Sequence, residues 1–195
     1  MTTTLVLVRH GEIVRPADTS NFDPAPLSDR GRRQVEALVD AWPVDRPAAL
    51  YASPLLRAMQ SASVLGEAFG LPTIIEPCLR EWAADVTGVP QPEYVALEER
   101  AWQDLGWVPP NGESLSMAAE RGRDCIDAIG KAHPGSTVAV MGHGTLFSLL
   151  AAELRGIRPT PEYKASIGFA HAAILSSGSR LLLLKDFARY GRPVA

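Results

Sequence analysis

The sequence predicts an α/β protein: a three-layer α/β/α sandwich with a mostly parallel central sheet and a small cap insertion. Short runs of leucine and β-branched residues alternate with amphipathic helical stretches, which is typical of strands joined by crossover helices. Two of these strands end in a histidine beside glycine, as expected at the ligand-binding edge of such a sheet. The 195 residues, 46% of them apolar, suffice for one domain with a full core, which we place over residues 1–195.

The first half of the chain begins with a strand, a loop and a helix. Thr3–Val8 is predicted to be a buried strand, and the polar stretch Gly11–Asp23 a loop. Ser28 can cap a helix over Asp29–Trp42, which Pro43 ends. The next elements are a strand over Ala48–Ala52, a helix opened by Ser53-Pro54 and running to Phe69, and a strand over Thr73–Ile75.

A cap insertion is predicted over residues 82–112, where prolines and aromatic residues gather around a short helix, Glu93–Leu105. Between positions 83 and 112 the only basic residue is Arg100, against five acidic residues. Trp102 and Trp107 either stack on a substrate or form the small core of the insertion, and the sequence leaves both readings open. The elements after the cap are a helix over Ser114–Ala132, a strand over Thr137–Met141, a helix ending near Leu154, and strands over Ala172–Ser176 and Arg180–Leu184.

Composition and short motifs exclude several classes of protein. The formal net charge of −3 argues against a nucleic-acid binder, and no apolar run approaches the roughly 18 residues of a membrane span. Cys78 and Cys125 lie far apart without CxxC spacing, so we expect no disulfide framework, no cysteine metal site and a cytoplasmic location. There is no HExxH helix, no Asp-rich cluster and no nucleotide-binding loop, so we expect neither a metal nor a cofactor.

The residues that carry chemistry follow strand ends and a helix start. His10 and His143 each follow a buried strand and stand beside glycine, and Gly11 is expected to make room for a ligand. Arg57 lies in the first turn of a helix, where free backbone N–H groups favour an anion. A lone histidine or arginine in such a place is as often a structural residue, but Arg9 beside His10 makes the group typical of a phosphate site.

Six motifs occur in a known order: LVLVRHGE, APLSDRGRRQVEAL, YASPLLRAMQSA, LREW, NGES and VMGHGTLFSLLA. From Leu5 to about Leu154 the chain resembles the histidine phosphatase superfamily, in its phosphoglycerate-mutase-like branch. This resemblance implies that His10 is the catalytic nucleophile and that Glu81 is the proton donor.

The same resemblance implies a phosphate-binding set of Arg9, Arg57 and His143, with His143 also catalytic. It places Glu113 at the substrate mouth. Trp82, beside the proton donor, is a second substrate-binding candidate. Phosphoryl transfer needs a nucleophile in line with the leaving oxygen and cations on the equatorial oxygens, and these residue types supply both.

The chain departs from the family after Glu12, where Ile13 and Val14 replace the usual threonine and polar residues near the phosphate. Asn21 is the one nearby amide that could reach the site. The acidic, aromatic cap is instead what leads us to expect a phosphatase acting on a small-molecule phosphomonoester with an uncharged or apolar remainder. Gly11 is expected to leave room for the phosphoryl group.

Three other functions stay open: a phosphoglycerate-mutase-type phosphotransferase, a non-catalytic phosphate-binding module and a metal hydrolase. The sequence does not settle the oligomeric state, so a homo-oligomer stays possible.

Overall fold

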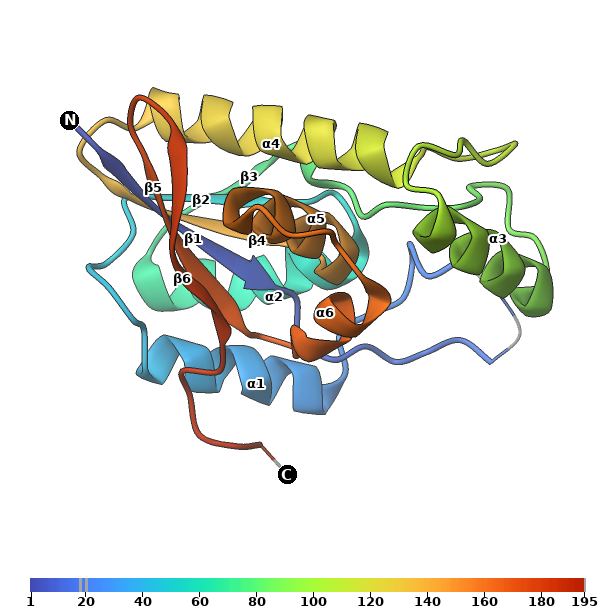
Figure 1. The fold of residues 1–195 in the computed structure, drawn as a ribbon. Coiled ribbons are helices and arrows are strands. Elements are labelled where there is room, and N and C mark those ends of the chain that lie inside the picture. The colour runs from blue at the N-terminus through green and yellow to red at the C-terminus, as the bar shows by residue number, and fades with distance from the viewer. Residues whose placement is uncertain (18, 20, 195) are drawn as a thin grey trace.

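The computed structural model describes residues 1–17, 19 and 21–194, and these form a six-stranded sheet between two layers of helices (Figure 1). The strands are β1 Thr3–Arg9, β2 Ala49–Ala52, β3 Thr73–Ile75, β4 Thr137–Gly142, β5 Ala172–Ser177 and β6 Leu181–Ala188. The helices are α1 Asp29–Asp40, α2 Leu56–Phe69, α3 Gln91–Gln103, α4 Leu115–Ala132, α5 Gly144–Arg155 and α6 Pro161–Ser166, with a short 3-10 turn, η1, over Pro77–Leu79. Positions 18 and 20 of the predicted loop and position 195 of the predicted domain lie outside the described residues.

The strand order is β3-β2-β4-β1-β5-β6, and β1 to β4 run parallel to one another. The hairpin β5–β6 completes one edge, with β5 antiparallel to β1. The predicted α/β sandwich with a mostly parallel sheet is confirmed. Because β1 and β4 are parallel neighbours in register Arg9↔Gly142, the residues that follow them meet at one edge of the sheet.

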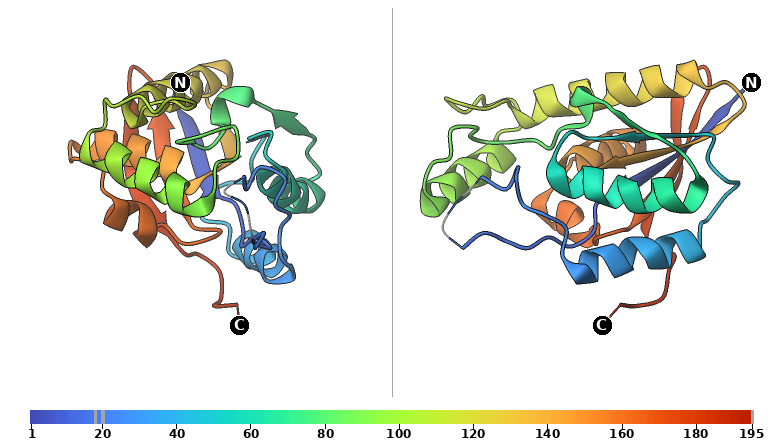
Figure 2. Two further views of the ribbon diagram at one scale, coloured as in Figure 1. Left: turned by 90° about the vertical axis from the view of Figure 1, so that its right-hand side faces the viewer. Right: turned by 180° about the vertical axis from the view of Figure 1, so that it is seen from behind.

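Both faces of the sheet are buried, which explains why β1 reads as a continuous apolar run. Leu5 and Leu7 pack against α4 and α5, whereas Val6 and Val8 pack against α1 and α2. Figure 2 shows these helix pairs on opposite faces of the sheet. The core therefore holds the carboxyl ends of β1 and β4 rigidly from both sides.

The predicted helix and strand positions agree with the structure apart from their ends. Ser28 caps α1 as expected, its Oγ accepting a hydrogen bond from the backbone N–H of Gly31 at 3.0 Å. The helix ends at Asp40, two residues before the predicted end. β6 continues to Ala188, and the six-residue helix α6 was not predicted, because so short a segment carries little periodicity.

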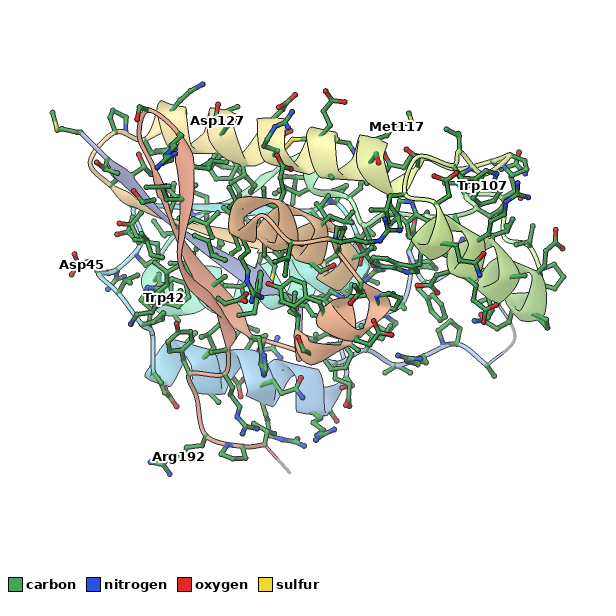
Figure 3. All side chains as sticks on the ribbon, in the orientation of Figure 1. Trp42, Asp45, Trp107, Met117, Asp127 and Arg192 are labelled. Atoms are coloured by element: carbon green, nitrogen blue, oxygen red, sulfur yellow. A yellow bond between two sulfur atoms is a disulfide. The ribbon has the colours of Figure 1, made fainter. Side chains whose placement is uncertain are left out.

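The cap lies beyond the end of the sheet toward which β1 points, with α3 as its helix (Figure 1). It packs on the body of the protein through Trp82, Trp102, Leu115 of α4 and Leu149 of α5. Trp107 packs at the edge of this cluster beside α3, with Arg100 above its ring at 4.4 Å (Figure 3). Of the two readings left open for Trp102 and Trp107, the structure supports a small core.

A disulfide joins Cys78, in η1, to Cys125, in α4, with their Cα atoms 5.9 Å apart. The expectation that no disulfide forms is wrong. The two cysteines are 47 residues apart in sequence, and only the packing of η1 against α4 brings them together. The expected cytoplasmic location rested on unpaired cysteines, and the disulfide removes that support. None of the described helices combines the length and the apolar character needed to span a bilayer.

Candidate active site

The candidate site lies where β1 and β4 end. His10 follows β1 and His143 follows β4, and the two imidazole rings are 5.3 Å apart, centre to centre, in an edge-on arrangement. The backbone continues the pairing beyond the strands, since the His10 N–H donates to the carbonyl of Gly142 at 3.0 Å. The sheet itself thus sets the distance between the two histidines.

His10 is 5% exposed, and its Nδ1 lies 2.7 Å from the carbonyl oxygen of Gly11. A carbonyl can only accept, so Nδ1 carries the hydrogen and Nε2 keeps a free lone pair. Burial, followed by the nearby Arg57 guanidinium, lowers the pKa of His10 to about 3. The ring is therefore neutral near pH 7, with its nucleophilic nitrogen fixed in direction by the backbone.

Gly11 does not make room for a ligand, as the sequence suggested. A side chain at this position would place its Cβ 2.3 Å from the carbonyl oxygen of Gly31 in α1. The glycine is required because α1 packs directly against the backbone beside His10. This contact ties the position of His10 to the first turn of the capped helix.

The guanidinium of Arg9 is held by the fold on one side only. Its Nη1 donates to the carbonyl of Ile167, and its charge lies 4.3 Å above the ring of Phe169. Its Nε is buried and has no hydrogen-bond partner among the described residues. Gly144 leaves space here, since a Cβ at that position would lie 3.2 Å from this Nε.

Arg57 approaches the same place from the first turn of α2, as predicted, and is 5% exposed. One of its Nη atoms donates to the carbonyl of Phe22 at 2.6 Å. Burial lowers the pKa of both Arg9 and Arg57, and the Glu81 carboxylate offsets part of this effect. Two arginines and one carboxylate therefore surround the face of His10.

His143 is fully buried, and its Nε2 lies 2.7 Å from the hydroxyl of Ser53. That hydroxyl accepts from the backbone N–H of Leu55 at 3.3 Å, so its own hydrogen is free to point to His143. Burial lowers the pKa of His143 well below its usual value. The ring is then neutral, and its Nδ1 has no partner within the described part of the chain.

Unpartnered buried polar atoms are uncommon, and each calls for an explanation. Two of them, Arg9 Nε and His143 Nδ1, belong to neighbours of His10, and a third, Trp102 Nε1, lies in the cap. The Arg9 guanidinium is suited to an anion, and so is His143 when its Nδ1 carries the ring hydrogen. The arrangement accordingly has the character of an oxyanion site that a ligand completes.

Glu81 is held at the N-terminus of α5. Its Oε1 accepts from the backbone N–H groups of Trp82 and Leu146, and its Oε2 from that of Thr145, each at 2.9 Å. The positive end of the helix stabilises the carboxylate. Three backbone N–H groups thus fix the direction of the Glu81 carboxyl group.

Two cavities open onto Glu81. The phosphate pocket, of about 300 Å³, is lined by Arg9, His10 and Arg57, with Ile13, Arg15 and Lys164 at its mouth. The cap cavity, of about 420 Å³, lies under the insertion and is lined among others by Asn21, Asp23, Arg80, Asp85, Asn111, Glu113 and Arg121. Phe22, Arg57, Glu81, Trp82 and Tyr94 line both. Glu81 therefore lies at the junction, where a leaving-group oxygen would be.

The structure places the two substrate-binding candidates in the wall of the cap cavity. Glu113 is paired with Arg121 through both carboxylate oxygens, so its charge is compensated within the protein. Trp82 is 3% exposed, and its indole N–H donates to the carbonyl of Glu113 at 2.7 Å. Asn21 lines the cap cavity and not the phosphate pocket, so it does not replace the missing polar contacts after Glu12.

Several residues of the site carry no signal in the sequence. Ser53 lies within a quoted motif, but nothing indicates that it contacts a histidine 90 residues away. Phe169, which supports both Arg9 and His10, belongs to no periodic pattern. Tyr94 reaches both cavities from α3, and burial raises its pKa to about 12, so its hydroxyl stays protonated.

No group of three or more histidine, cysteine, aspartate and glutamate side chains suited to a metal ion occurs in the part of the chain that is described.

The family model of the histidine phosphatase superfamily (branch 1) matches residues 5–180. The chain belongs to this superfamily. It is accordingly an enzyme, a histidine phosphatase, and the resemblance seen in the motifs is confirmed.

Similar proteins of this family carry more than one activity in their names. A glucosyl-3-phosphoglycerate phosphatase of Mycolicibacterium vanbaalenii is 30% identical over 184 residues, which cover 87% of this chain and 81% of the relative. A protein of Yersinia enterocolitica named "Probable phosphoglycerate mutase GpmB" is 29% identical over 164 residues, or 80% and 76% of the two chains. A solved mycobacterial glucosyl-3-phosphoglycerate phosphatase shares the fold with a TM-score of 0.77 at 24% identity, covering 98% of this chain and all of the other.

Proposed function

We propose that this histidine phosphatase is a metal-independent enzyme that hydrolyses a small phosphomonoester through a phosphohistidine on Nε2 of His10. The proposal rests on the protonation and the hydrogen bonding of His10. Its ring is neutral, its Nδ1 is bound to the Gly11 carbonyl, and its free Nε2 lies among arginines and donors without partners. Such a nitrogen is a competent nucleophile, and the surroundings stabilise the charge of a transferring phosphoryl group.

In the first step Nε2 of His10 attacks phosphorus, and the bond between phosphorus and the alcohol oxygen breaks. Arg9 and Arg57 neutralise the equatorial oxygens, where forked guanidinium groups bind best. Glu81, in its protonated form, gives its proton to the departing alcohol. The positive charge that forms on the imidazole is stabilised by the Gly11 carbonyl, which accepts from Nδ1.

In the second step a water molecule attacks the phosphohistidine, and Glu81, now ionised, takes a proton from it. The bond between phosphorus and Nε2 breaks, inorganic phosphate leaves and the neutral His10 is restored. The three backbone N–H groups around Glu81 hold the carboxylate ready for this second role. One carboxyl group thus serves as acid and then as base.

A mutase uses the same first step but returns the phosphoryl group to the substrate. Similarity to a protein named as a phosphoglycerate mutase makes this the second candidate. The two differ in product: incubation with 3-phosphoglycerate and a bisphosphate primer gives the isomer for a mutase and inorganic phosphate for a phosphatase. We expect no isomer with or without the primer, and at most a slow release of inorganic phosphate.

The test compares the wild type with His10→Ala on p-nitrophenyl phosphate and on glycerol 3-phosphate, with EDTA present. We expect the wild type to release phosphate and His10→Ala to lose at least about 10³-fold of kcat. His133→Gln is the matched control, because His133 contacts Tyr51 far from the pocket and should keep its activity. Hydrolysis that persists in His10→Ala, or that EDTA abolishes, would contradict the proposal.

Glu81 has its own test, which depends on the leaving group. Glu81→Gln should lower kcat about 10²-fold for an alkyl phosphate, because the departing alkoxide needs a proton. The loss should be several-fold smaller for p-nitrophenyl phosphate, whose phenolate leaves without one. Equal losses on both substrates would mean that Glu81 does not deliver the proton.

A further inference from the structure

The cap cavity differs from the phosphate pocket in how far its charged side chains are paired with one another. Besides Glu81 and Arg57, which belong to the phosphate pocket as well, it is lined by three carboxylates and two guanidinium groups. A substrate that enters with its phosphate on His10 must place the rest of its structure against these groups. What the cavity accepts therefore depends on which of the charges are free.

Glu113 and Arg121 neutralise each other completely. The Nε of Arg121 donates to Oε2 of Glu113 at 3.2 Å, and Nη2 donates to Oε1. The remaining nitrogen of the Arg121 guanidinium, Nη1, donates to the backbone carbonyls of Cys78 and Arg80 at 2.7 and 3.0 Å. Each nitrogen of this guanidinium is in use, so a substrate carboxylate would have to displace Glu113.

The other charged groups of the cavity are paired too. Arg80 donates to Oδ2 of Asp23 at 2.6 Å across the entrance. Asp85 is 8% exposed and accepts from the N–H and hydroxyl of Thr87, from Gly88 and from the amide of Asn111. Burial would raise the pKa of Asp85, but these hydrogen bonds lower it to about 2, so it is ionised and satisfied.

Aromatic faces and amide groups make up much of the remaining wall. Phe22, Trp82 and Tyr94 line the junction with the phosphate pocket, and Asn21 and Asn111 lie farther out. A volume of about 420 Å³ lies within the roughly 300–1,000 Å³ of ordinary ligand cavities. Such a wall suits a ring with hydroxyl groups, which stacks on aromatic residues and exchanges hydrogen bonds without introducing a charge.

We propose that the substrate is the phosphomonoester of an uncharged, hydroxyl-bearing alcohol such as a sugar or polyol, and that the Glu113–Arg121 pair excludes carboxylate-bearing esters. The inference rests on the proposed function and concerns its substrate. Apart from Arg57, which the phosphoryl group engages, a carboxylate in the cap cavity meets Glu113, Asp85 and Asp23, and the guanidinium groups of Arg80 and Arg121 there are already paired. Exclusion of a competing substrate by an unfavourable charge is a common basis of specificity.

The experiment uses two substrates with the same three-carbon skeleton. Glycerol 3-phosphate carries a hydroxymethyl group where 3-phosphoglycerate carries a carboxylate. For the wild type we expect kcat/KM for glycerol 3-phosphate to exceed that for 3-phosphoglycerate at least about tenfold, the effect of one unfavourable charge contact. Glucose 6-phosphate should be hydrolysed at least as well as glycerol 3-phosphate, because its ring fills more of the cavity.

Glu113→Gln then tests the pair itself. The amide keeps the shape and leaves the charge of Arg121 uncompensated, while the bond from Trp82 to the backbone of Glu113 is untouched. We expect the ratio of the two kcat/KM values to move at least about tenfold toward 3-phosphoglycerate. Asp23→Asn, which frees Arg80, should move it in the same direction, and Glu99→Gln, an exposed position outside both cavities, should leave it unchanged.

A wild-type preference for 3-phosphoglycerate would overturn the inference. So would a ratio that neither Glu113→Gln nor Asp23→Asn moves. If p-nitrophenyl phosphate is not hydrolysed either, the proposed phosphatase function fails and the inference fails with it. Hydrolysis of p-nitrophenyl phosphate together with preference for the carboxylate ester would overturn the substrate class alone.

Discussion

The phosphate pocket and the cap cavity share a wall but treat polar groups in opposite ways. At and beside the phosphate pocket, Arg9 Nε and His143 Nδ1 are buried without partners among the described residues. In the cap cavity, Arg121 and Arg80 are bound to carboxylates of the chain. The first region thus holds buried polar atoms that the described chain leaves unpaired, whereas the guanidinium groups of the second are paired within the protein. On the function proposed above, the phosphoryl group is bound by charge and the remainder of the substrate by shape and hydrogen bonding.

The largest expected effect contrasts one arginine from each region. Arg57→Met should lower kcat/KM for p-nitrophenyl phosphate about 10³-fold, because it removes a buried cation that meets the transferring phosphoryl group. Arg80→Met should lower it less than about tenfold, since Arg80 is 46% exposed and already paired with Asp23. Steady-state kinetics of both variants measure these two losses of kcat/KM. Equal losses would remove the distinction between the two regions.

Loss of the disulfide tests how the cap-cavity wall is held. The bond joins Cys78 of η1, three residues before Glu81, to Cys125 of α4. The same helix carries Arg121. Closing a loop of 47 residues stabilises the fold by up to about 4 kcal/mol, so Cys78→Ala with Cys125→Ala should lower the free energy of unfolding by that order.

Urea unfolding of the double variant, with the untreated and dithiothreitol-treated wild type beside it, measures this change. The KM for glucose 6-phosphate should rise more than the inhibition constant of inorganic phosphate, because the bond supports the cap cavity more directly than the phosphate pocket. An unchanged free energy of unfolding in both the variant and the reduced wild type would contradict this account of the bond.

Lowering the pH should destabilise the phosphate pocket in particular. The pKa of His10 is about 3 in the folded protein and about 6.5 when unfolded, so the unfolded chain binds the extra proton between these values. Stability is therefore full above pH 6.5 and falls as the pH drops toward 3. Between pH 7 and 5 the loss due to His10 is about 2 kcal/mol.

His10→Gln isolates this effect, because it removes the titrating group and keeps a polar side chain. Its free energy of unfolding should fall less than that of the wild type over the same pH range, by the same amount of about 2 kcal/mol. Parallel pH curves for the two proteins would mean that His10 titrates in the folded state as it does in the unfolded state.

The smallest effect concerns the mouth of the phosphate pocket. Lys164 of α6 and Glu98 of α3 form an ion pair at 2.6 Å, with side chains 31% and 28% exposed. Such a pair is screened by water and salt, so Glu98→Gln should cost less than about 1 kcal/mol of stability and change kcat/KM less than about fivefold. A larger loss of activity, insensitive to 0.5 M salt, would make this pair part of the recognition of the phosphoryl group.

The sequence was most informative where function follows local structure. Arg9 ends a strand and His10 follows it, His143 follows another strand, and Arg57 lies in the first turn of a helix. Periodicity therefore places them at the carboxyl edge of a parallel sheet. Their meeting is then a consequence of neighbouring strands with matched ends. The sandwich and the order of its elements could be predicted for the same reason, whereas several helix and strand ends could not.

The rest depends on packing between segments far apart in sequence. The Cys78–Cys125 bond, the Ser53–His143 contact and the Arg121 fork each join segments with no common pattern. Gly11 is an example of a role that sequence order does not predict. The adjacent histidine suggested that the glycine makes room for a ligand, but in the structure it makes room for the backbone of α1. Which carboxylates are paired, and hence what the cap cavity accepts, could not be predicted from the order of residues.

The central claim is that the phosphoryl group passes through Nε2 of His10. Rapid acid-free quenching of the wild type during turnover of p-nitrophenyl phosphate, followed by peptide mapping by mass spectrometry and ³¹P NMR, tests it directly. The account predicts a burst of p-nitrophenol and one phosphoryl group on Nε2 of His10, labile to acid and stable to alkali. No burst and no labelled peptide, or a phosphoryl group on another residue, would contradict it.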